Sequence, residues 1–436
     1  MSWKTDYEKK KTTVEQAAKL IKSGDIVWST PNNNAPYTLL NAIGDRYKEL
    51  KDVKLCVQLL TKPLSCFVPE AQGHIEVVTG FKGPGERAGE QAGFKLDTIA
   101  FQLHRHDELM LRVLRPTVGL IQITPPDEDG NCYVGCNSTG ITEIFDTAKL
   151  IIAQVNSTIP SIYNEGLCIN INKVDVVVEV DEKIDVVPNI EPSELDRKVA
   201  SYIVDMIPNG STIQIGIGGI ANAVGYSLEH HKDLGVHTEL YVEAMYYLTM
   251  KGAINNSKKT LYPGKSVIGF ASGSEDMYKF LDKNPAIMNR EIQWVNNPAV
   301  VAQNDNFVSL NACIGVDLLG QVSSESIGFR QFSGTGGQLD FVRGAQKSKN
   351  GMSFLAMQSV VEKKDGSRIS KITLTHAPGS AITVPRTDVQ YVCTEYGIVN
   401  LQNQSIDYRA KALISIAHPD FRDQLTFEAK KAGIII

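Results

Sequence analysis

The chain has little that would place it in a membrane or on nucleic acid. No apolar run in its 436 residues approaches the roughly 20 residues that a membrane helix needs. Its 49 acidic residues outnumber the 44 basic ones and leave a net charge of −5, whereas a nucleic-acid partner favours a basic face. The segment Met1–Lys10 lacks the apolar core of a secretory signal. We therefore expect a cytoplasmic globular protein with neither a membrane partner nor a nucleic-acid partner.

The chain also lacks the cysteine pattern of a disulfide framework and the spacing of a metal site. It has 7 scattered cysteines, an odd number that is typical of reduced thiols in the cytosol. Cys132 and Cys136 are close in sequence, but no second pair of ligands is near, and two small apolar positions beside a turn explain them. The run His104–Glu108 lacks the i, i+4 spacing of a helical zinc site, and we interpret it as a solvated charged stretch. We expect no bound metal.

The residues that are present describe a soluble α/β protein. Hydrophobic residues make up 42% of the chain and charged residues 21%, and the length allows two or three domains. Short β-branched runs alternate with amphipathic stretches, which is typical of α/β folds. The expected strands are Asp25–Ser29, Val53–Leu60, Gly119–Thr124, Leu150–Val155, Val174–Val180, Thr212–Gly216, Phe307–Leu310 and Ile372–Thr375. The expected helices are Thr13–Ser23, Pro36–Lys48 and Ser193–Met206, the last with Ser193 as its cap.

A weak internal repeat predicts two related halves. Gly24–Ser29 reads as a strand that leads through a loop into a helix, and Gly210–Gly216 begins the same order of elements later in the chain. The distance to the next strand is nearly the same in both passages. The repeat predicts two topologically related open α/β domains, 1–190 and 191–436, with the active site in the cleft between them.

Two glycine-rich loops are candidates for ligand binding. Gly216-Ile217-Gly218-Gly219 follows a strand and opens a helix, so its free N–H groups favour an anion, although a plain tight turn explains it as well. The third glycine of a dinucleotide fingerprint is missing, which counts against a dehydrogenase. The second loop, Ser333–Phe341, can present several N–H groups to an oxyanion, and the alternative is a mobile surface loop.

Glu239 is the candidate reactive carboxylate. It lies in Val236–Val242, where alternation predicts a strand that ends at the edge where open sheets bind ligands. A carboxylate at that edge can serve as a base, a metal ligand or a nucleophile. The alternatives are an exposed glutamate in an ion pair, or Glu243 in its place.

Several longer stretches carry a resemblance to a known family. They are Thr124–Gly130, Gly210–Val224, His237–Glu239, Asn311 with Val316–Val322, Gly336–Ala345, Tyr391–Gly397 and Ile416–Arg422. Taken in this order, they resemble family I coenzyme A transferases, in particular the acetyl-CoA hydrolase/4-hydroxybutyrate CoA-transferase branch, which includes butyryl-CoA:acetate CoA-transferases. The resemblance extends over nearly the whole chain, and its combination of motifs is specific.

The resemblance implies roles for individual residues. Glu239 would be the catalytic nucleophile, Asn311 would donate to the oxyanion, and Gly337 would flank the acyl group. The implied coenzyme A and acyl-binding residues are Gln214, Gly216, Gly218, Gly219, Asn222, Gly336 and Gln338. Coenzyme A would act as a substrate in the form of acyl-CoA, and no permanently bound cofactor is expected. Self-association as a homodimer or homotetramer is also implied.

The implied reaction moves coenzyme A from a short-chain acyl-CoA to a free carboxylate by ping-pong chemistry through a glutamyl-CoA thioester. Acetate, butyrate, propionate and 4-hydroxybutyrate are the acids expected for this branch. The chain departs from the family pattern after Glu239, at Tyr241–Met245, and again at Asn156–Ser161, so the acyl pair stays open. The alternatives are an acyl-CoA hydrolase and a non-catalytic CoA-ester-binding protein.

Overall fold

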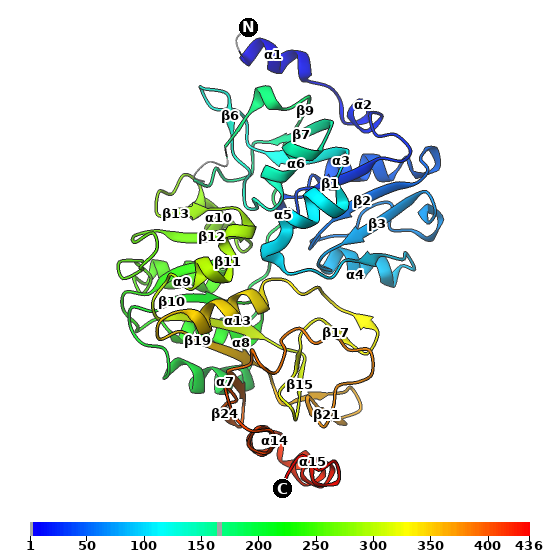
Figure 1. Cartoon of the computed structure of the whole chain (residues 1–436). Helices are drawn as coiled ribbons and strands as arrows, with labels where there is room; N and C mark the ends of the chain where they lie inside the picture. Colours follow the sequence, from blue (N-terminus) through cyan, green and yellow to red (C-terminus); the bar gives the residue numbers. More distant parts are fainter. Residues whose placement is uncertain (1–2, 164–167) are drawn as a thin grey trace. The chain divides into compact units, whose positions relative to one another are not determined.

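The computed structural model describes residues 3–163 and 168–436, which form two compact units (Figure 1). The first unit extends to Pro188 and also contains Val267–Val295, and the second contains Asn189–Ser266 and Asn296–Ile436. Each unit has its own largely parallel sheet with helices packed against it, which confirms the predicted α/β fold class. These compact units are interleaved along the chain. The continuous domains 1–190 and 191–436 stay a prediction.

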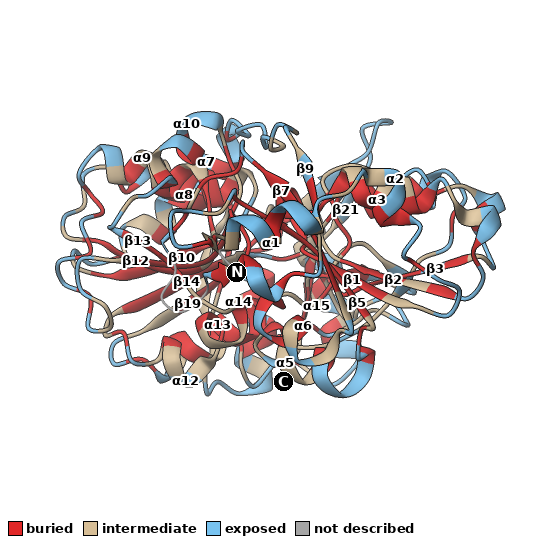
Figure 2. Ribbon diagram, turned by 90° about the horizontal axis from the view of Figure 1, so that it is seen from above, coloured by how far each residue is buried: buried red, intermediate tan, exposed pale blue. Residues whose placement is uncertain are grey.

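The sheet of the first unit has 7 strands in the order β4-β3-β2-β1-β5-β7-β9, and all of its pairings are parallel. The strands are β1 (Ile26–Ser29), β2 (Val53–Val57), β3 (Ile75–Thr79), β4 (Asp97–Thr98), β5 (Val118–Ile123), β7 (Leu150–Asn156) and β9 (Val176–Val180). The helices include α2 (Val14–Ala18), α3 (Tyr37–Gly44), α4 (Pro84–Gln91) and α6 (Ile141–Thr147). β5 is buried along its whole length, because parallel strands are covered on both faces (Figure 2).

The sheet of the second unit continues the same architecture. Its strands within the unit follow the order β11-β10-β14-β19-β23-β24, with only β24 antiparallel to its neighbour. The strands are β10 (Thr212–Ile215), β11 (Gly235–Tyr241), β14 (Phe307–Ala312), β19 (Met352–Ala356), β23 (Tyr391–Thr394) and β24 (Gly397–Asn400). The helices include α7 (Glu194–Val204), α8 (Gly219–Ser227), α9 (Glu243–Met250), α13 (Gln338–Lys347), α14 (Ile406–Ser415) and α15 (Pro419–Lys431).

The two sheets share one topology. The order β2-β1-β5-β7-β9 in the first unit corresponds strand for strand to β11-β10-β14-β19-β23 in the second. Both sheets are therefore open parallel sheets, and their ligand-binding edge lies at the carboxyl ends of the strands. The predicted start of α7 is confirmed: the Ser193 hydroxyl accepts from the Asp196 N–H, and the Asp196 carboxylate accepts from the Ser193 N–H.

Some expected elements are shorter than the sequence pattern suggests. α2 ends at Ala18 rather than at residue 23, because the chain turns where the Lys22 N–H donates to the Asp25 side chain. α3 ends at Gly44, a residue that disfavours helix continuation. The strand expected at Ile372–Thr375 covers only Ile372–Thr373, and it pairs with Gly315–Asp317 in a separate small sheet.

In residues 3–163 and 168–436, none of the helices combines the length and the apolar character that a membrane span requires.

Candidate active site

Glu239, Gly216 and Asn311 lie in one row across three neighbouring strands of the second unit. β10 pairs with β11 through Thr212 and Gly235, and with β14 through Thr212 and Phe307. Four residues further along each strand, this register brings Gly216 between Glu239 and Asn311 on one face of the sheet. Because glycine has no side chain, nothing on β10 itself separates the carboxylate from the amide.

The Glu239 carboxylate is held by two neutral donors. The Asn296 side-chain amide donates to Glu239 Oε2 at 2.7 Å, and the backbone N–H of Gly337 donates to the same carboxylate. A Cβ atom at position 337 would lie 1.9 Å from Glu239 Oε2 and 2.1 Å from Asn296 Nδ2. Any residue other than glycine at position 337 must therefore displace the carboxylate.

The environment of Glu239 favours its neutral form more than water does. Burial raises the pKa of its carboxyl group to about 7, and the nearby charge of Asp340 acts in the same direction. The Asn296 and Gly337 hydrogen bonds oppose this shift because they favour the charged form. Near neutral pH the carboxyl group therefore exchanges readily between its two forms, a property that is common among reactive carboxylates.

The second glycine loop ends at the start of a helix. Gly336 has a φ of +56°, and Gly337 is the residue that caps α13. The first turn of α13 leaves N–H groups without partners within the helix, and these favour negative charge nearby. Gln338 directs its side-chain amide to the Ala312 carbonyl at the end of β14, 3.1 Å away. The loop therefore joins the ends of β11 and β14.

The Asn311 amide is engaged by two other buried polar side chains. Asn311 Nδ2 donates to Ser309 Oγ at 3.0 Å, and the Gln214 amide donates to Asn311 Oδ1 at 3.2 Å. Gln214 was expected to contact coenzyme A, and the structure places it beside Ser309 with only 4% of its surface exposed. Its contacts are therefore those of a residue that supports Asn311.

The first glycine loop lies beside a carboxylate of the same chain. Gly218 caps α8 with a φ of +111°, and a Cβ at Gly219 would lie 2.3 Å from the Asp196 carboxylate. Asn222 donates to the Ile190 carbonyl at 2.8 Å, so its amide is also used within the unit. Ile217 is 60% exposed. This loop presents an apolar side chain and a nearby negative charge, which suits an uncharged ligand segment better than a phosphate.

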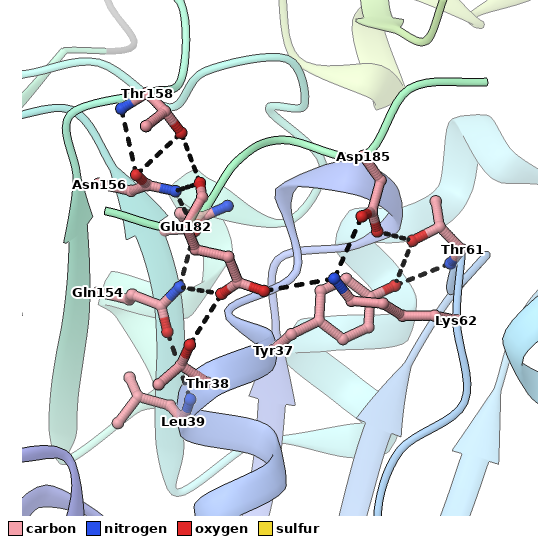
Figure 3. A network of polar contacts seen from close by, with 11 residues as sticks. Tyr37, Thr38, Leu39, Thr61, Lys62, Gln154, Asn156, Thr158, Glu182 and Asp185 are labelled. Carbon is pink, nitrogen blue, oxygen red and sulfur yellow. Dashed lines mark hydrogen bonds and ion pairs between the residues drawn. The ribbon is translucent and has the colours of Figure 1, made fainter. Parts of the chain in front are cut away.

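In the first unit, the matching edge of the sheet is filled by its own side chains (Figure 3). Glu182 accepts from Thr38 at 2.8 Å and from Lys62 at 3.3 Å, and Asp185 accepts from Lys62 at 3.1 Å. These carboxylates come from the segment that follows β9. The edge is thus occupied by internal ion pairs rather than left open for a ligand.

The first unit also lacks a counterpart of the reactive carboxylate. The repeat aligns Gly24 with Gly210, and the strand register then places Gln58 where the second unit has Glu239. Gln58 lies 3.3 Å from His106 Nε2. The interpretation of 104–108 as solvated is wrong for His106, which is fully buried, and this burial lowers its pKa to about 4. The second unit therefore has a carboxylate at the position where the first unit has Gln58.

Two residues that the sequence did not single out complete the site. Asn296 follows the short helix Ile292–Val295, and Asp340 lies in the first turn of α13. Asn296 lies outside the named motifs and Asp340 lies within the stretch Gly336–Ala345, and only the folded chain brings both to Glu239. In the part of the chain that the structure describes, no cluster of three or more His, Cys, Asp or Glu side chains could hold a metal ion.

Comparison with family models identifies two matching domains. Residues 115–191 match the acetyl-CoA hydrolase/transferase N-terminal domain, and residues 273–429 match the acetyl-CoA hydrolase/transferase C-terminal domain.

Three proteins are similar to the chain over nearly its full length. A probable butyrate:acetyl-CoA coenzyme A-transferase of Syntrophomonas wolfei is 38% identical, with 98% of this chain and 97% of the relative covered. A 4-hydroxybutyrate coenzyme A transferase of Clostridium kluyveri is 35% identical, covering 99% of this chain and 100% of the relative. The crystal structure of RipA from Yersinia pestis has a TM-score of 0.92 at 33% identity, with both chains covered completely.

Proposed function

Because this chain belongs to the acetyl-CoA hydrolase/transferase family, we propose that it is a CoA-transferase in which the Glu239 carboxylate carries coenzyme A between two acids. The relatives named above act on butyrate, acetyl-CoA and 4-hydroxybutyrate, so the proposed substrates are short-chain acyl-CoA esters and free carboxylates. One observation carries the proposal for the site. Glu239 is held by Asn296 and Gly337 in the same row as Gly216 and Asn311.

The first half of the reaction loads the enzyme. The Glu239 carboxylate attacks the thioester carbonyl carbon and the C–S bond breaks. This step forms an acyl-glutamyl anhydride and releases coenzyme A as a thiolate. The thiolate then attacks the glutamyl carbonyl of the anhydride. The anhydride C–O bond breaks, the first acid leaves as its carboxylate, and coenzyme A remains on residue 239 as a thioester.

The second half reverses these steps with another acid. The incoming carboxylate attacks the glutamyl-CoA thioester and gives a new anhydride and the CoA thiolate. The thiolate attacks the carbonyl of the new acid, which leaves as its CoA ester and regenerates the Glu239 carboxylate. One thioester is exchanged for another, so no external energy source or net proton transfer is required.

Asn311 is the proposed donor to the oxyanion that forms in each attack. A carboxylate is a weak nucleophile towards a thioester, so the charge that develops on the carbonyl oxygen must be stabilised. One such donor typically contributes on the order of 3 kcal/mol to the transition state. The row in which only Gly216 separates Glu239 from Asn311 supports this role, because the carboxylate and the amide share one face of the sheet with no side chain between them.

The two glycine loops are proposed to line the coenzyme A chain. Gly216, Gly218 and Gly219 would contact its uncharged pantetheine part, since Asp196 adjoins Gly219 and Ile217 is exposed there. Gly336 would flank the acyl group beside Gly337. Gln338 and Asn222 make contacts within the unit, and their proposed role is to shape these loops.

The cellular setting and the assembly are also proposals. All seven cysteines are free, and six of them are buried, which supports a reducing compartment such as the cytoplasm. We propose a homodimer or homotetramer, which light scattering of the purified protein at several concentrations tests directly.

A trapping experiment with two glutamate variants tests the reaction. The wild-type protein is incubated with butyryl-CoA without an acceptor acid and then treated with borohydride, which reduces a glutamyl thioester to an alcohol. We expect mass spectrometry to find this change at residue 239, and Glu239→Gln to lose exchange by more than about 10³-fold. Glu243→Gln, four residues away at the start of α9, is the matched control and should keep its activity.

Rates measured with and without an acceptor acid separate transfer from hydrolysis. In a transferase, release of free coenzyme A is slow until a carboxylate acceptor is added, and initial rates follow ping-pong kinetics. A rate of coenzyme A release that does not depend on added acid would favour the hydrolase. Retention of activity in Glu239→Gln together with its loss in Glu243→Gln would contradict the assigned nucleophile.

A further inference from the structure

Ser309 lies at the centre of a closed ring of hydrogen bonds beneath the oxyanion donor. Its hydroxyl donates to Gln214 Oε1 at 2.7 Å and accepts from Asn311 Nδ2 at 3.0 Å. Gln214 closes the ring by donating from Nε2 to Asn311 Oδ1 at 3.2 Å. Ser309 is fully buried, so water does not compete for these bonds.

The strand register explains why these three side chains meet. Gln214 and Ser309 are direct partners across β10 and β14, and Asn311 is two residues further along β14 on the same face. The row of Gln214 and Ser309 therefore lies two residues before the row that contains Glu239 and Asn311, on the same face of the sheet. The row of Gln214 and Ser309 supports this second row from within the unit.

Two arrangements of donors and acceptors close this ring, and they run in opposite directions around it. A side-chain amide can present either its NH₂ group or its oxygen when it is turned over. In the arrangement that the structure shows, Gln214 Nε2 donates to Asn311 Oδ1 and the Ser309 hydroxyl donates to Gln214 Oε1. In either arrangement Gln214 and Ser309 hold both ends of the Asn311 amide, and Asn311 Nδ2 also lies 3.2 Å from Gln214 Oε1.

We propose that Ser309 and Gln214 are positioning residues that hold the Asn311 side chain in the row of Glu239, where its amide can donate to the developing oxyanion. This inference rests on the proposed CoA-transfer function. Without the ring, the Asn311 side chain can take other positions, away from the reacting carbonyl. The nucleophile would be intact, but a fraction of the enzyme would lack its donor.

Substitution of Ser309 tests this role. We expect Ser309→Ala to lower kcat about 10-fold or more while the KM for the acyl-CoA changes little, since the lost interaction acts in the transition state. Gln214→Met, which keeps the shape but removes the amide, should lower kcat in the same way, and it preserves the test if Ser309→Ala folds poorly. Thermal unfolding and coenzyme A binding report whether each variant is folded.

Ser353→Ala is the matched control. Ser353 is the direct partner of Ser309 on the next strand, β19, and is equally buried, but its hydroxyl bonds with Gln390 and Gln346 and not with Asn311. It should keep the kcat of the wild type. An equal loss in Ser353→Ala and Ser309→Ala would show that any missing hydroxyl in this layer harms the fold, and would overturn the proposal.

A double-mutant cycle decides between positioning and structural support. If Ser309 acts only through Asn311, Ser309→Ala should cost about 10-fold in the wild-type background and about nothing in Asn311→Ala. Equal losses in both backgrounds, or a wild-type kcat in Ser309→Ala, would overturn the proposal. The proposed function fails separately, through an active Glu239→Gln protein or an unmodified residue 239 in the trapping experiment.

Discussion

The pKa of Glu239 is set by burial and by neighbours that have opposite effects on it. Burial and Asp340 push the pKa of Glu239 upward, and the donors Asn296 and Gly337 pull it down. Because only the ionised carboxylate attacks a thioester, this balance sets how much of the enzyme is ready to react at a given pH. A single substitution of Asn296 removes one of the two hydrogen bonds that lower the pKa of Glu239.

The activity should therefore depend on pH in a predictable direction. We expect kcat/KM for the acyl-CoA to rise with pH through a midpoint of about 7, the pKa of Glu239 in the folded protein. Asn296→Ala removes a donor that favours the charged form, so its midpoint should move to higher pH. Initial rates measured on both sides of neutrality give both midpoints.

The neighbouring asparagine supplies the control for this experiment. Asn297 caps the short helix that begins at Pro298, and its side chain accepts from the Ala299 N–H rather than contacting Glu239. Asn297→Ala should keep the wild-type midpoint, even if it unfolds at a lower temperature. An unchanged midpoint in Asn296→Ala would contradict the role of Asn296 in tuning Glu239.

At the scale of elements, the site depends on where α13 begins. Gly337 caps this helix, and its N–H reaches the carboxylate at the end of β11. The contact is possible because residue 337 has no Cβ, which would lie 1.9 Å from Glu239 Oε2. The start of one helix thus determines the position of a side chain on a distant strand.

Gly337→Ala should uncouple the helix from the nucleophile. The added methyl group must push the Glu239 carboxylate aside, and a displacement of about 1 Å at a reacting group typically costs about 10²-fold in rate. Thermal unfolding should change little, because alanine in place of glycine at a helix cap costs roughly 1 kcal/mol or less. Measurement of kcat and of glutamyl-CoA trapping checks this, and near-normal trapping would contradict the role of the close approach.

On the scale of the whole molecule, two sheets of one topology have different uses. The first unit closes its ligand edge with the Glu182, Asp185 and Lys62 contacts and has Gln58 at the nucleophile position. The second unit keeps the Glu239 carboxylate, whose pKa burial raises, at the same edge. A buried carboxylate that must ionise lowers stability, so catalysis and stability are in conflict at this point.

This conflict gives a prediction for the stability of the whole protein. The pKa of Glu239 is raised from 4.5 to about 7 by folding, so between these pH values the folded protein binds more protons than the unfolded chain. This contribution to the free energy of unfolding therefore falls as the pH rises through that window. Glu239→Gln has no group to ionise at this position, so its free energy of unfolding does not fall for this reason as the pH rises.

Chemical denaturation of both proteins across this window tests the sign. The stability of Glu239→Gln relative to the wild type should increase by about 2 to 3 kcal/mol from pH 5 to pH 8. Glu86 and Lys259, whose pKa values burial shifts to about 7, are present in both proteins, so their effects cancel in the difference. A difference that stays constant with pH would contradict a raised pKa at Glu239.

The amino-acid sequence by itself determined the α/β class, the repeated order of strands, the cap of α7 and the strand on which Glu239 lies. These features arise from local patterns of apolar, glycine and capping residues, which act over a few neighbours in the chain. The ends of α2 and α3 were less predictable, because turns and glycine compete with helix formation at those points.

Only the tertiary structure decided what surrounds the carboxylate. Asn296, Asp340 and Gln214 come from separate segments, and they meet Glu239 or Asn311 only in the folded chain. The raised pKa, the close approach of Gly337 and the burial of His106 likewise depend on packing between distant segments. A pKa responds to burial and to nearby charges in space, and the linear order of residues specifies neither.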